Sequence, residues 1–447
     1  MSELTRTRHA VRLEATNHEG SLLGKNVSPA KFEAGKEAGF AFADILFAID
    51  LNNEIVLGDA FPEWRGNLYD IHMVPDLSTR VEWRPGLDSV IGDYWLKDGR
   101  AVPLCPRNMV RRLVDRLAHL GYDATAAVEI EATLFEESVQ EARARGYRDL
   151  TPLGGGTGAT YHLARSSDWV DYMDAVVARL DHLGISWEAW TDEAAPGQTE
   201  LNLAPTDPLR LADNWVRTRQ VMREVAFEQG HTVSFMAKPT AGFGQGAHIN
   251  ISLQRDGANQ FFADDGPSEV MRHAVGGLLA TMAGATSVVL PQITSYRRLV
   301  DLTGPPTTIS WGVNNKTAAV RAITGHPGYS RLEYRLPGAD VNPYLAIAVV
   351  LAGVLAGIEG RIEPPEQVTD MAWCLPDDSG VERIPDTMSK AWRALAIDPL
   401  LREHLGDEFV DFWVASRRWE WMEFHTKGGD PFAELSGWES TRYFEFP

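Results

Sequence analysis

Cysteine is nearly absent from the sequence, since Cys105 and Cys374 are the only two among 447 residues. Two cysteines provide neither a disulfide framework nor a thiolate metal cluster, which fits a reducing compartment. The first twenty residues lack the apolar core of a signal peptide, and we find no run of about 18 uncharged apolar residues to mark a membrane span. We therefore expect a cytoplasmic protein with no membrane partner.

Positive charge is also scarce. The sequence has 42 Lys and Arg residues against 62 Asp and Glu residues, which gives a formal net charge of -20. Nucleic-acid phosphates are bound by basic faces, and the Lys and Arg residues form no long run, so we expect no nucleic-acid partner. The excess of carboxylates instead fits a protein that binds divalent cations.

The common phosphate-binding loops are missing as well. GxxxxGK[ST] does not occur, and two glycine-rich segments lack the GxGxxG pattern followed by a helix. These segments are GGGTGA (154–159) and GFGQGA (242–247). Both are predicted to be mobile loops.

The length predicts two to three domains, and we expect a small one followed by a large one. Residues Phe40–Val56 fit a strand, a turn and a second strand, and the segment 1–103 has few helical patterns. An amphipathic helix is predicted from Pro106 to a stop at Gly121. We therefore place a small β-rich domain at 1–103 and a large domain at 104–447.

In the large domain, helical and strand patterns alternate. Helices are expected near 167–183, 207–229, 268–287 and 342–358, with short strands between them. This order predicts an α+β fold in which helices flank a curved antiparallel sheet. The tryptophan-rich segment WVASRRWEWMEF is predicted to form a packed, half-exposed helix.

Polar residues recur on one face of several predicted strands. In AAVEIEATLF, Glu129 and Glu131 point to the side opposite the apolar residues and lie roughly 7 Å apart. Glu193 and Glu200 flank a Pro-Gly turn, so a hairpin would bring them together. Two further strands carry the same alternation, and their polar residues are His248, Asn250 and Ser252, then Arg331, Glu333 and Arg335.

This set of side chains indicates phosphoryl-transfer chemistry. Five Glu residues and one His would line one surface, and hard carboxylate oxygens with one imidazole suit Mg²⁺ or Mn²⁺. Two such ions with nearby arginines are what phosphoryl transfer from ATP requires. Any one strand alone fits an ordinary solvated polar face, but four strands with the same pattern favour a shared site.

The ordered motifs of residues 70 to 447 resemble the glutamine synthetase family. The matching segments are PLCPRN, VEIEATLF, EAAPGQTE, KPTAGFGQGAHINISL, SYRRLV, NNKTAAVR, RLEYRLPGADVNPYL and the Trp/Glu-rich tail. The resemblance implies an N-terminal β-grasp domain, a catalytic domain and active sites shared between neighbouring subunits of stacked rings, with a dodecamer of two hexameric rings expected. ATP and two or three Mg²⁺ or Mn²⁺ ions are the implied cofactors.

The resemblance also implies roles for individual residues. One metal ion would be held by Glu131, Glu193 and Glu200, and the second by Glu129, His248 and Glu333. Arg298 matches the arginine that pairs with the α-carboxylate of glutamate, and Gly244 lies in the acid-binding loop. Lys316, Arg321 and Arg335 match arginines that contact phosphates and the reacting γ-carboxyl group, and Ser252 and Arg331 lie where the nucleotide binds. We expect Arg298, Lys316 and Arg335 to be catalytic.

Two departures from the family concern the ammonium site. The family flap whose Glu binds ammonium is replaced by RLVDLTGPP, with Gly304 at the matching position. The DGSS segment that supplies an Asp is replaced by GDAFPEWRGN. Asp301, Asp59 or Glu63 could supply a replacement carboxylate.

A pocket without these anions would bind ammonium poorly, because a desolvated cation needs a paired charge. We therefore hypothesise a glutamate–amine ligase that works through an acyl phosphate on a larger amine, for example a neutral arylamine, for which a strong base matters less. The alternatives are glutamine synthetase proper, a ligase for another acid, and a non-catalytic relative.

Four other positions depart from the family. Asn250 stands in place of a second His, and Phe243 replaces an Asn in the acid-binding loop. Lys316 replaces an Arg, which gives a point charge instead of a bidentate fork. Trp373 occupies the place of a Tyr that some bacterial members adenylylate, so we expect no such regulation.

Overall fold

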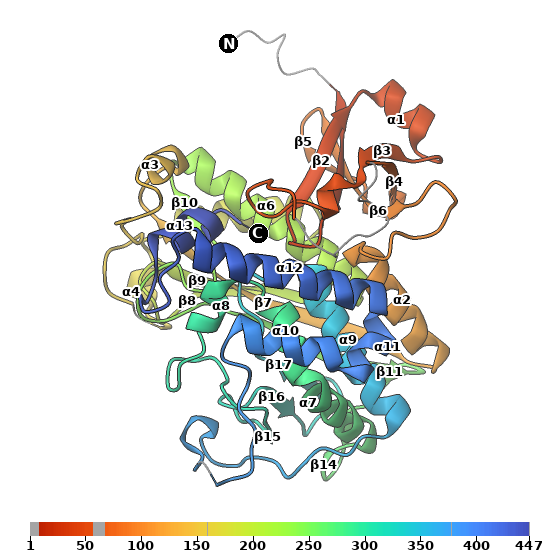
Figure 1. Cartoon of the computed structure of the whole chain (residues 1–447), viewed down its shortest axis with the longest axis vertical. Coiled ribbons are helices and arrows are strands. Elements are labelled where there is room, and N and C mark those ends of the chain that lie inside the picture. The colour runs from red at the N-terminus through yellow and green to blue at the C-terminus, as the bar shows by residue number, and fades with distance from the viewer. Residues whose placement is uncertain (1–8, 57–67, 159, 377, 447) are drawn as a thin grey trace.

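The computed structural model describes residues 9–56, 68–158, 160–376 and 378–446, and these form two main sheets with helices around the larger one (Figure 1). The smaller sheet comes from the N-terminal residues and has the strand order β2-β1-β6-β4-β3, with β5 also paired to β6. Its strands are β1 (Ala10–Thr16), β2 (Leu22–Val27), β3 (Phe40–Ala43), β4 (Asp70–Pro75), β5 (Val81–Arg84) and β6 (Leu87–Trp95). Strand β1 runs parallel to β6, and the other pairs in this sheet are antiparallel.

The prediction of two strands over Phe40–Val56 is half right. Strand β3 forms as expected, but a 3-10 turn over Asp44–Phe47 follows it, and the second strand is reduced to one bridge between Ile49 and Ile55. Leu46 and Phe47 are both buried. Adjacent residues of a strand face opposite sides, so only a helical turn lets both side chains enter the core.

The larger sheet positions the candidate site and has the order β15-β16-β17-β11-β7-β9-β8. Its strands are β7 (Asp123–Phe135), β8 (Trp187–Asp192), β9 (Gln198–Thr206), β10 (Thr232–Ser234), β11 (Ala247–Arg255), β12 (Ala258–Asn259), β15 (Trp311–Val313), β16 (Val320–Ile323) and β17 (Arg331–Tyr334). The sheet is largely antiparallel, as predicted, and is mixed at one edge, where β15 runs parallel to β16. A separate hairpin joins β13 (Phe262–Ala263) to β14 (Gly266–Pro267).

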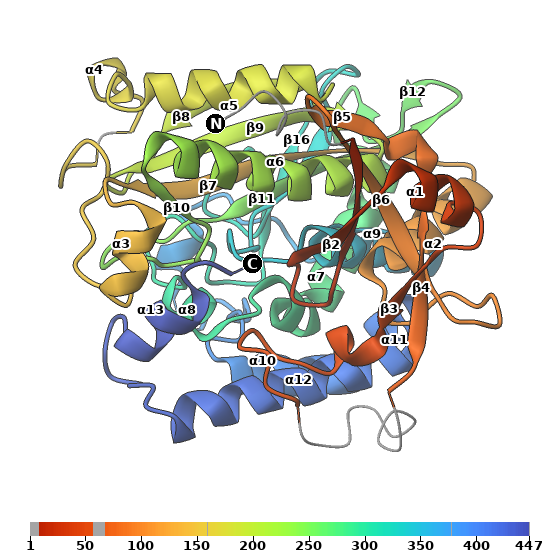
Figure 2. The same ribbon diagram turned by 90° about the horizontal axis from the view of Figure 1, so that it is seen from above.

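The predicted long helices all form within the described residues. Helix α5 covers Val170–His182, α6 covers Pro208–Gln229, α7 covers Glu269–Val289 and α9 covers Pro343–Gly360. The remaining helices are α1 (Pro29–Gly35), α2 (Pro106–His119), α3 (Val139–Ala144), α4 (Leu163–Ser166), α8 (Ile293–Arg297), α10 (Met388–Ile397), α11 (Pro399–Leu405), α12 (Asp407–Thr426) and α13 (Gly437–Tyr443). Figure 2 shows α5 and α6 along one side of the molecule and α12, the tryptophan-rich helix, along the opposite side.

Helix α9 is long and apolar enough to cross a membrane by composition alone, and 83% of its window is buried in the protein. It packs against α7, α2 and α6. Burial on all sides explains its composition, because a helix at the centre of a large domain needs no polar face.

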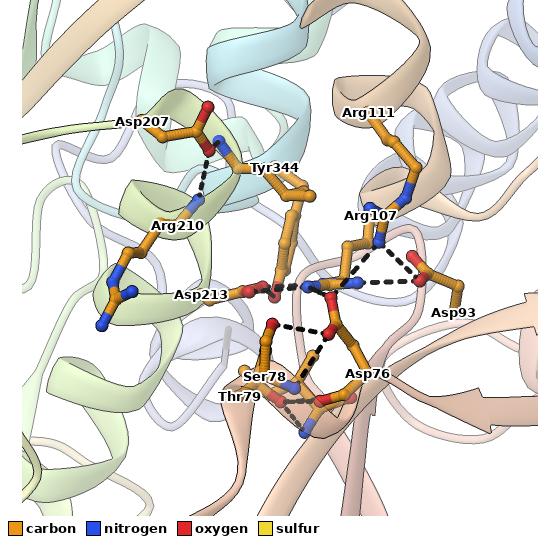
Figure 3. Close-up of polar contacts among 12 residues, drawn as sticks. Asp76, Ser78, Thr79, Asp93, Arg107, Arg111, Asp207, Arg210, Asp213 and Tyr344 are labelled. Carbon is orange, nitrogen blue, oxygen red and sulfur yellow. Dashed lines mark hydrogen bonds and ion pairs between the residues drawn. The ribbon is translucent and has the colours of Figure 1, made fainter. Parts of the chain in front are cut away.

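A buried arginine connects the N-terminal sheet to a helix beside the larger sheet (Figure 3). Arg107, near the start of α2, donates to both oxygens of Asp213 at 2.9 and 2.8 Å, to Asp93 at 2.7 Å and to Asp76 at 2.8 Å. Tyr344 on α9 donates to Asp213 at 2.6 Å. The hydrophobic core likewise contains residues of both sheets. The domain boundary near residue 103 stays a prediction.

Candidate active site

A cavity of about 380 Å³ contains most of the residues that the sequence singled out. The predicted residues that line it are Glu129, Glu131, Glu193, Glu200, Gly244, His248, Arg298, Lys316, Arg321, Glu333 and Arg335. Ser252 and Arg331 line a second cavity, which shares Glu129 and Asn202 with the first. The two cavities therefore adjoin, with the Glu129 carboxylate and the Asn202 side chain at their boundary.

Strand pairing brings the polar residues together. Glu131 on β7 lies directly opposite Glu200 on β9, and Glu129 lies opposite His248 on β11. On the other side of β11, Asn250 pairs with Glu333 of β17. Because residues opposite each other in a sheet share a face, one face collects the polar side chains of four strands.

Two groups of possible metal ligands result, and His248 belongs to both. Within each group the ligand atoms lie within 4.8 Å of one another, and the groups are Glu129, His248 and Glu333, and Glu131, Glu200 and His248. The first group is one of the two predicted metal sites. The second contains two of the three residues predicted for the other site, and Glu193 lines the same cavity.

Hydrogen bonds fix the first group. Glu129 lies 3.1 Å from His248 Nδ1 and accepts a bond of 3.1 Å from Asn250, whose own oxygen accepts one of 2.9 Å from Arg331. Glu333 is buried and accepts from Arg321 at 3.0 Å and from Arg335. Asn250 thus links Glu129 to an arginine of the second cavity, because its amide nitrogen donates to the carboxylate and its oxygen accepts from Arg331.

Glu131 is held by a residue that the sequence analysis missed. Gln198 donates to Glu131 at 3.1 Å and to the carbonyl of Gly244 at 3.1 Å, and the Gly246 amide also donates to Glu131. Gln198 lies two residues before Glu200 on β9, so the period of two that revealed the glutamates also places it on their face.

Several carboxylates of the cluster lie close enough to repel one another, since ligand atoms within each group are at most 4.8 Å apart. Burial and then repulsion by Glu129, Glu131 and Glu193 raise the pKa of Glu200 to about 9. Burial and Glu131 raise the pKa of Glu193 to about 7. Burial also acts to raise the pKa of Glu129. The hydrogen bond and charge of His248 outweigh burial there and lower this pKa to about 2. A cation at the Glu193–Glu200 end would relieve the repulsion.

Arg298 is buried beside this cluster. Its guanidinium donates to the carbonyl of Leu336 at 2.9 Å, and burial lowers its pKa to about 10. A Cβ atom at Gly244 would lie 2.7 Å from Arg298 Cγ, and one at Gly246 would lie 2.5 Å from Arg298 Nη2. The two glycines therefore let the backbone lie directly against the arginine.

The segment that replaces the family flap forms one wall of the cavity, through residues 302–305. Gly304 has φ +110°, and an added Cβ would meet no atom within 4 Å. Asp301 does not line the cavity. Its carboxylate instead accepts hydrogen bonds from Arg383 and Thr307. The other two candidates for a replacement anion, Asp59 and Glu63, lie outside the described residues. Trp373 supports this wall by donating to the carbonyl of Pro305 at 2.8 Å.

Tyr161 and Leu302 also line the cavity and were missed by the sequence analysis. Both have positive φ angles, of 58° and 67°. A single sequence does not reveal such conformations, because Tyr and Leu rarely adopt positive φ angles and nothing in the residue type predicts them.

Residues 103–436 match the catalytic domain of glutamine synthetase. Together with the mixed sheet that this domain builds, the match makes the protein an ATP-dependent carbon–nitrogen ligase. The chain belongs to the glutamine synthetase family, as its motifs predicted.

Two relatives are named as enzymes that join glutamate to amines other than ammonia. The chain is 31% identical to a glutamate–isopropylamine ligase of Pseudomonas sp, over 97% of this chain and 95% of the relative. It is 31% identical to a gamma-glutamylethanolamide synthetase of Streptomyces coelicolor, over 96% and 90%. A solved GmaS–ADP complex has a TM-score of 0.82 at 26% identity, over 98% of this chain and 96% of that one. Enzymes named simply glutamine synthetase lie at 28–31% identity.

Proposed function

We propose that the protein joins L-glutamate to an organic amine and forms a γ-glutamyl amide, with ATP converted to ADP and phosphate. The observation that carries this proposal is the pair of ligand groups that share His248, in a cavity that four cationic side chains also line. These cations are Arg298, Lys316, Arg321 and Arg335. Carboxylates alternating with cations suit the transfer of a phosphoryl group between anionic partners.

Two or three Mg²⁺ or Mn²⁺ ions fit the carboxylate cluster. Glu131, Glu193 and Glu200 would hold one ion, and Glu129, His248 and Glu333 another. Burial and neighbouring carboxylates raise the pKa values of Glu193 and Glu200, and a bound cation would favour their charged forms. Oxygen ligands with one imidazole suit these metals. When bound, the ions supply positive charge that neutralises phosphate oxygens.

Different residues of the site would bind glutamate, the phosphates and the nucleoside. Arg298 would bind the α-carboxylate of glutamate, with the backbone of Gly244 beside it. Lys316, Arg321 and Arg335 would contact the phosphates and the reacting γ-carboxyl group, and Ser252 and Arg331 would hold the nucleoside in the second cavity. These positions would hold a γ-carboxylate oxygen in line with the terminal phosphorus of ATP.

The reaction then has two steps. The γ-carboxylate oxygen attacks the terminal phosphorus, ADP leaves, and γ-glutamyl phosphate forms. The amine nitrogen next attacks the acyl carbon, the bond from carbon to the phosphate oxygen breaks, phosphate leaves, and one N–H proton leaves with the phosphate or to water. The cationic side chains would stabilise the negative charge that develops on the carbonyl and phosphate oxygens.

An organic amine is favoured over ammonium by the wall at residues 302–305. Gly304 offers neither a charge nor a side chain, and space remains around it. Two relatives are named for amine groups larger than ammonium, namely isopropylamine and the ethanolamide group. We further propose a cytoplasmic homo-oligomer, built as a dodecamer of two stacked hexameric rings.

The test is phosphate release from ATP with Mg²⁺, glutamate and a panel of amines, with the amide product detected by mass spectrometry. We expect turnover with at least one organic amine at a kcat/KM above that for ammonia. Glu333→Gln should lower kcat at least about a hundredfold, because it removes a proposed ligand of the second metal ion and weakens the contacts with Arg321 and Arg335. Glu82→Gln, on an exposed strand of the N-terminal sheet, serves as the matched control. Turnover with ammonia alone would point to glutamine synthetase. Absence of turnover with every amine would point to a non-catalytic relative.

A further inference from the structure

Three large apolar side chains stand exposed on the lining of the cavity. Tyr161 is 68% exposed, Leu302 is 62% exposed and Phe243 is 42% exposed, and all three line the same cavity as the carboxylates. They come from three separate segments. Tyr161 lies in the loop before α4, Phe243 in the loop before β11, and Leu302 in the segment between α8 and β15. Large exposed apolar groups that converge on one cavity mark a surface that a ligand covers.

Two of these side chains are held in an unfavourable backbone conformation. Tyr161 has φ 58° and Leu302 has φ 67°, a region that bulky residues rarely occupy. Such positions are unfavourable and persist at ligand-binding sites. Asp192 helps to fix the Tyr161 loop, because its carboxylate accepts from the His162 amide at 3.1 Å and the Ser166 hydroxyl at 2.7 Å.

The same cavity has room beside these groups. Gly304 lies in the wall next to Leu302, and a Cβ atom added there would meet nothing within 4 Å. The burial of an apolar substituent against Phe243 and Leu302 would therefore need no rearrangement of this wall. An aromatic ring in such a place is stabilised by its contact with the Phe243 ring as well as by its burial.

The charges around the cavity leave little for a cationic amine. The titratable groups that face it are the five glutamates, His248, Tyr161 and the four cations already described. The glutamates are proposed metal ligands or bind arginines, and the nearby carboxylate of Asp301 is bound by Arg383. Among the described lining residues, no further carboxylate is left to pair with an ammonium group or to take its proton.

From this geometry we infer that the amine substrate is neutral at pH 7 and carries an apolar, flat substituent, which is the chemistry of an arylamine. The inference rests on the proposed function and names its second substrate. An arylamine attacks the acyl carbon with its free electron pair, the bond from carbon to the phosphate oxygen breaks, and one N–H proton leaves with the phosphate or to water. An alkylammonium ion must lose an additional proton before it attacks, and this step needs a base.

The experiment compares aniline with cyclohexylamine, which is similar in size but cationic, and with hydroxylamine and ammonium. Phosphate release is measured with glutamate, ATP and Mg²⁺ at several pH values. At about pH 7.5, kcat/KM for aniline should exceed that for cyclohexylamine by at least about tenfold. The ratio of the two values should fall by about tenfold per pH unit between about pH 7 and 9, since only the neutral form of the alkylamine reacts.

A variant tests the apolar contact. Phe243→Ala should lower the ratio of kcat/KM for aniline to that for hydroxylamine by about tenfold, which corresponds to the loss of one aromatic contact. Phe227→Ala, which removes an exposed phenylalanine on α6 outside the cavity, should leave this ratio unchanged. A preference for cyclohexylamine or ammonium at about pH 7.5, or an unchanged ratio in Phe243→Ala, overturns the inference but not the proposed function. Absence of turnover with every amine overturns the proposed function itself.

Discussion

At the scale of single residues, the carboxylate cluster is the feature that dominates the chemistry. Glu131 and Glu200 lie opposite each other on paired strands, and Glu193 adds a third negative charge to the same cavity. Burial prevents water from screening these charges, and the metal-free protein responds by holding protons on Glu193 and Glu200. Protonation and metal binding therefore compete for the same oxygen atoms.

This competition predicts how stability depends on pH. The folded protein binds protons at Glu193 and Glu200 that the unfolded chain releases near the ordinary glutamate pKa of 4.5. Without metal, the free energy of unfolding should therefore fall as pH rises from about 4.5 through about 9. Mg²⁺ should restore it, and its stabilisation should be larger at about pH 8.5 than at about pH 6 by on the order of 1 kcal/mol or more, because one pKa unit is worth about 1.4 kcal/mol.

Thermal unfolding with and without MgCl₂ measures this effect. Glu200→Gln should reduce the difference between the two pH values, whereas Glu82→Gln on the N-terminal sheet should retain it. An equal Mg²⁺ effect at both pH values in the unsubstituted protein would contradict the prediction.

At the scale of elements, the short helix α8 sets the position of Arg298, which follows it directly. The Ser295 hydroxyl donates to Asp340 at 2.6 Å and accepts from the Gln292 amide at 3.0 Å. Asp340 is fully buried, and burial raises its pKa to about 6. A Cβ atom at Gly338 would lie 2.4 Å from the Asp340 carboxylate, so glycine there leaves room for it. Asp340 thus ties α8 to the segment before α9.

The loss of this tie should affect the acid substrate selectively. Ser295→Ala removes a hydrogen bond to a carboxylate, which is worth about 1.5–3 kcal/mol, and frees the first turn of α8. We expect the KM for glutamate to rise about tenfold while the KM for ATP changes less than about twofold. Steady-state kinetics with each substrate varied in turn provides the measurement.

A matched control is Ser416→Ala, which removes an equally buried hydroxyl in α12 that bonds the Trp413 carbonyl. It should lower stability without changing the KM for glutamate. If Ser295→Ala raised both KM values equally, the role of Ser295 would be structural only.

At the scale of the whole molecule, the two sheets are held together by charge as well as by packing. Arg107 is 3% exposed and contacts carboxylates of the N-terminal sheet and of α6 (Figure 3). Glu14 of β1 makes a second such link, since it accepts from Arg217 of α6 at 3.0 Å. Buried pairs of this kind stabilise little when complete, but removal of one partner leaves a charge with no counter-ion.

Arg107→Met should therefore destabilise the protein by about 3–5 kcal/mol, because three aspartates lose their shared cation. The N-terminal sheet should become sensitive to protease before the rest of the chain. Urea denaturation and limited proteolysis measure the two effects. Arg80→Met, which breaks a half-exposed pair with Asp88, should change stability by less than about 1 kcal/mol.

The strand alternation around Glu129 and His248 was sufficient to predict that their side chains share one face, because a period of two fixes which side chains do so. Their assignment to one metal ion came from the resemblance to the family and stays a prediction. The same reasoning left out Gln198, although it obeys the same period. Tyr161 and Leu302 could not be predicted in this way. Their place on the cavity depends on backbone conformations that residue type disfavours and on loops whose path is set by distant contacts.

The sequence by itself determined the α+β fold class, the long helices and the polar face of the large sheet, since periodicity and helix-ending residues act over a few neighbours. It also determined the family, through motifs whose order survives at about 30% identity. Only the tertiary structure decided that Asp301 turns to Arg383 and that the wall beside Gly304 is open. Such contacts join segments far apart in the chain, and their geometry depends on the packing of the whole domain rather than on any local pattern.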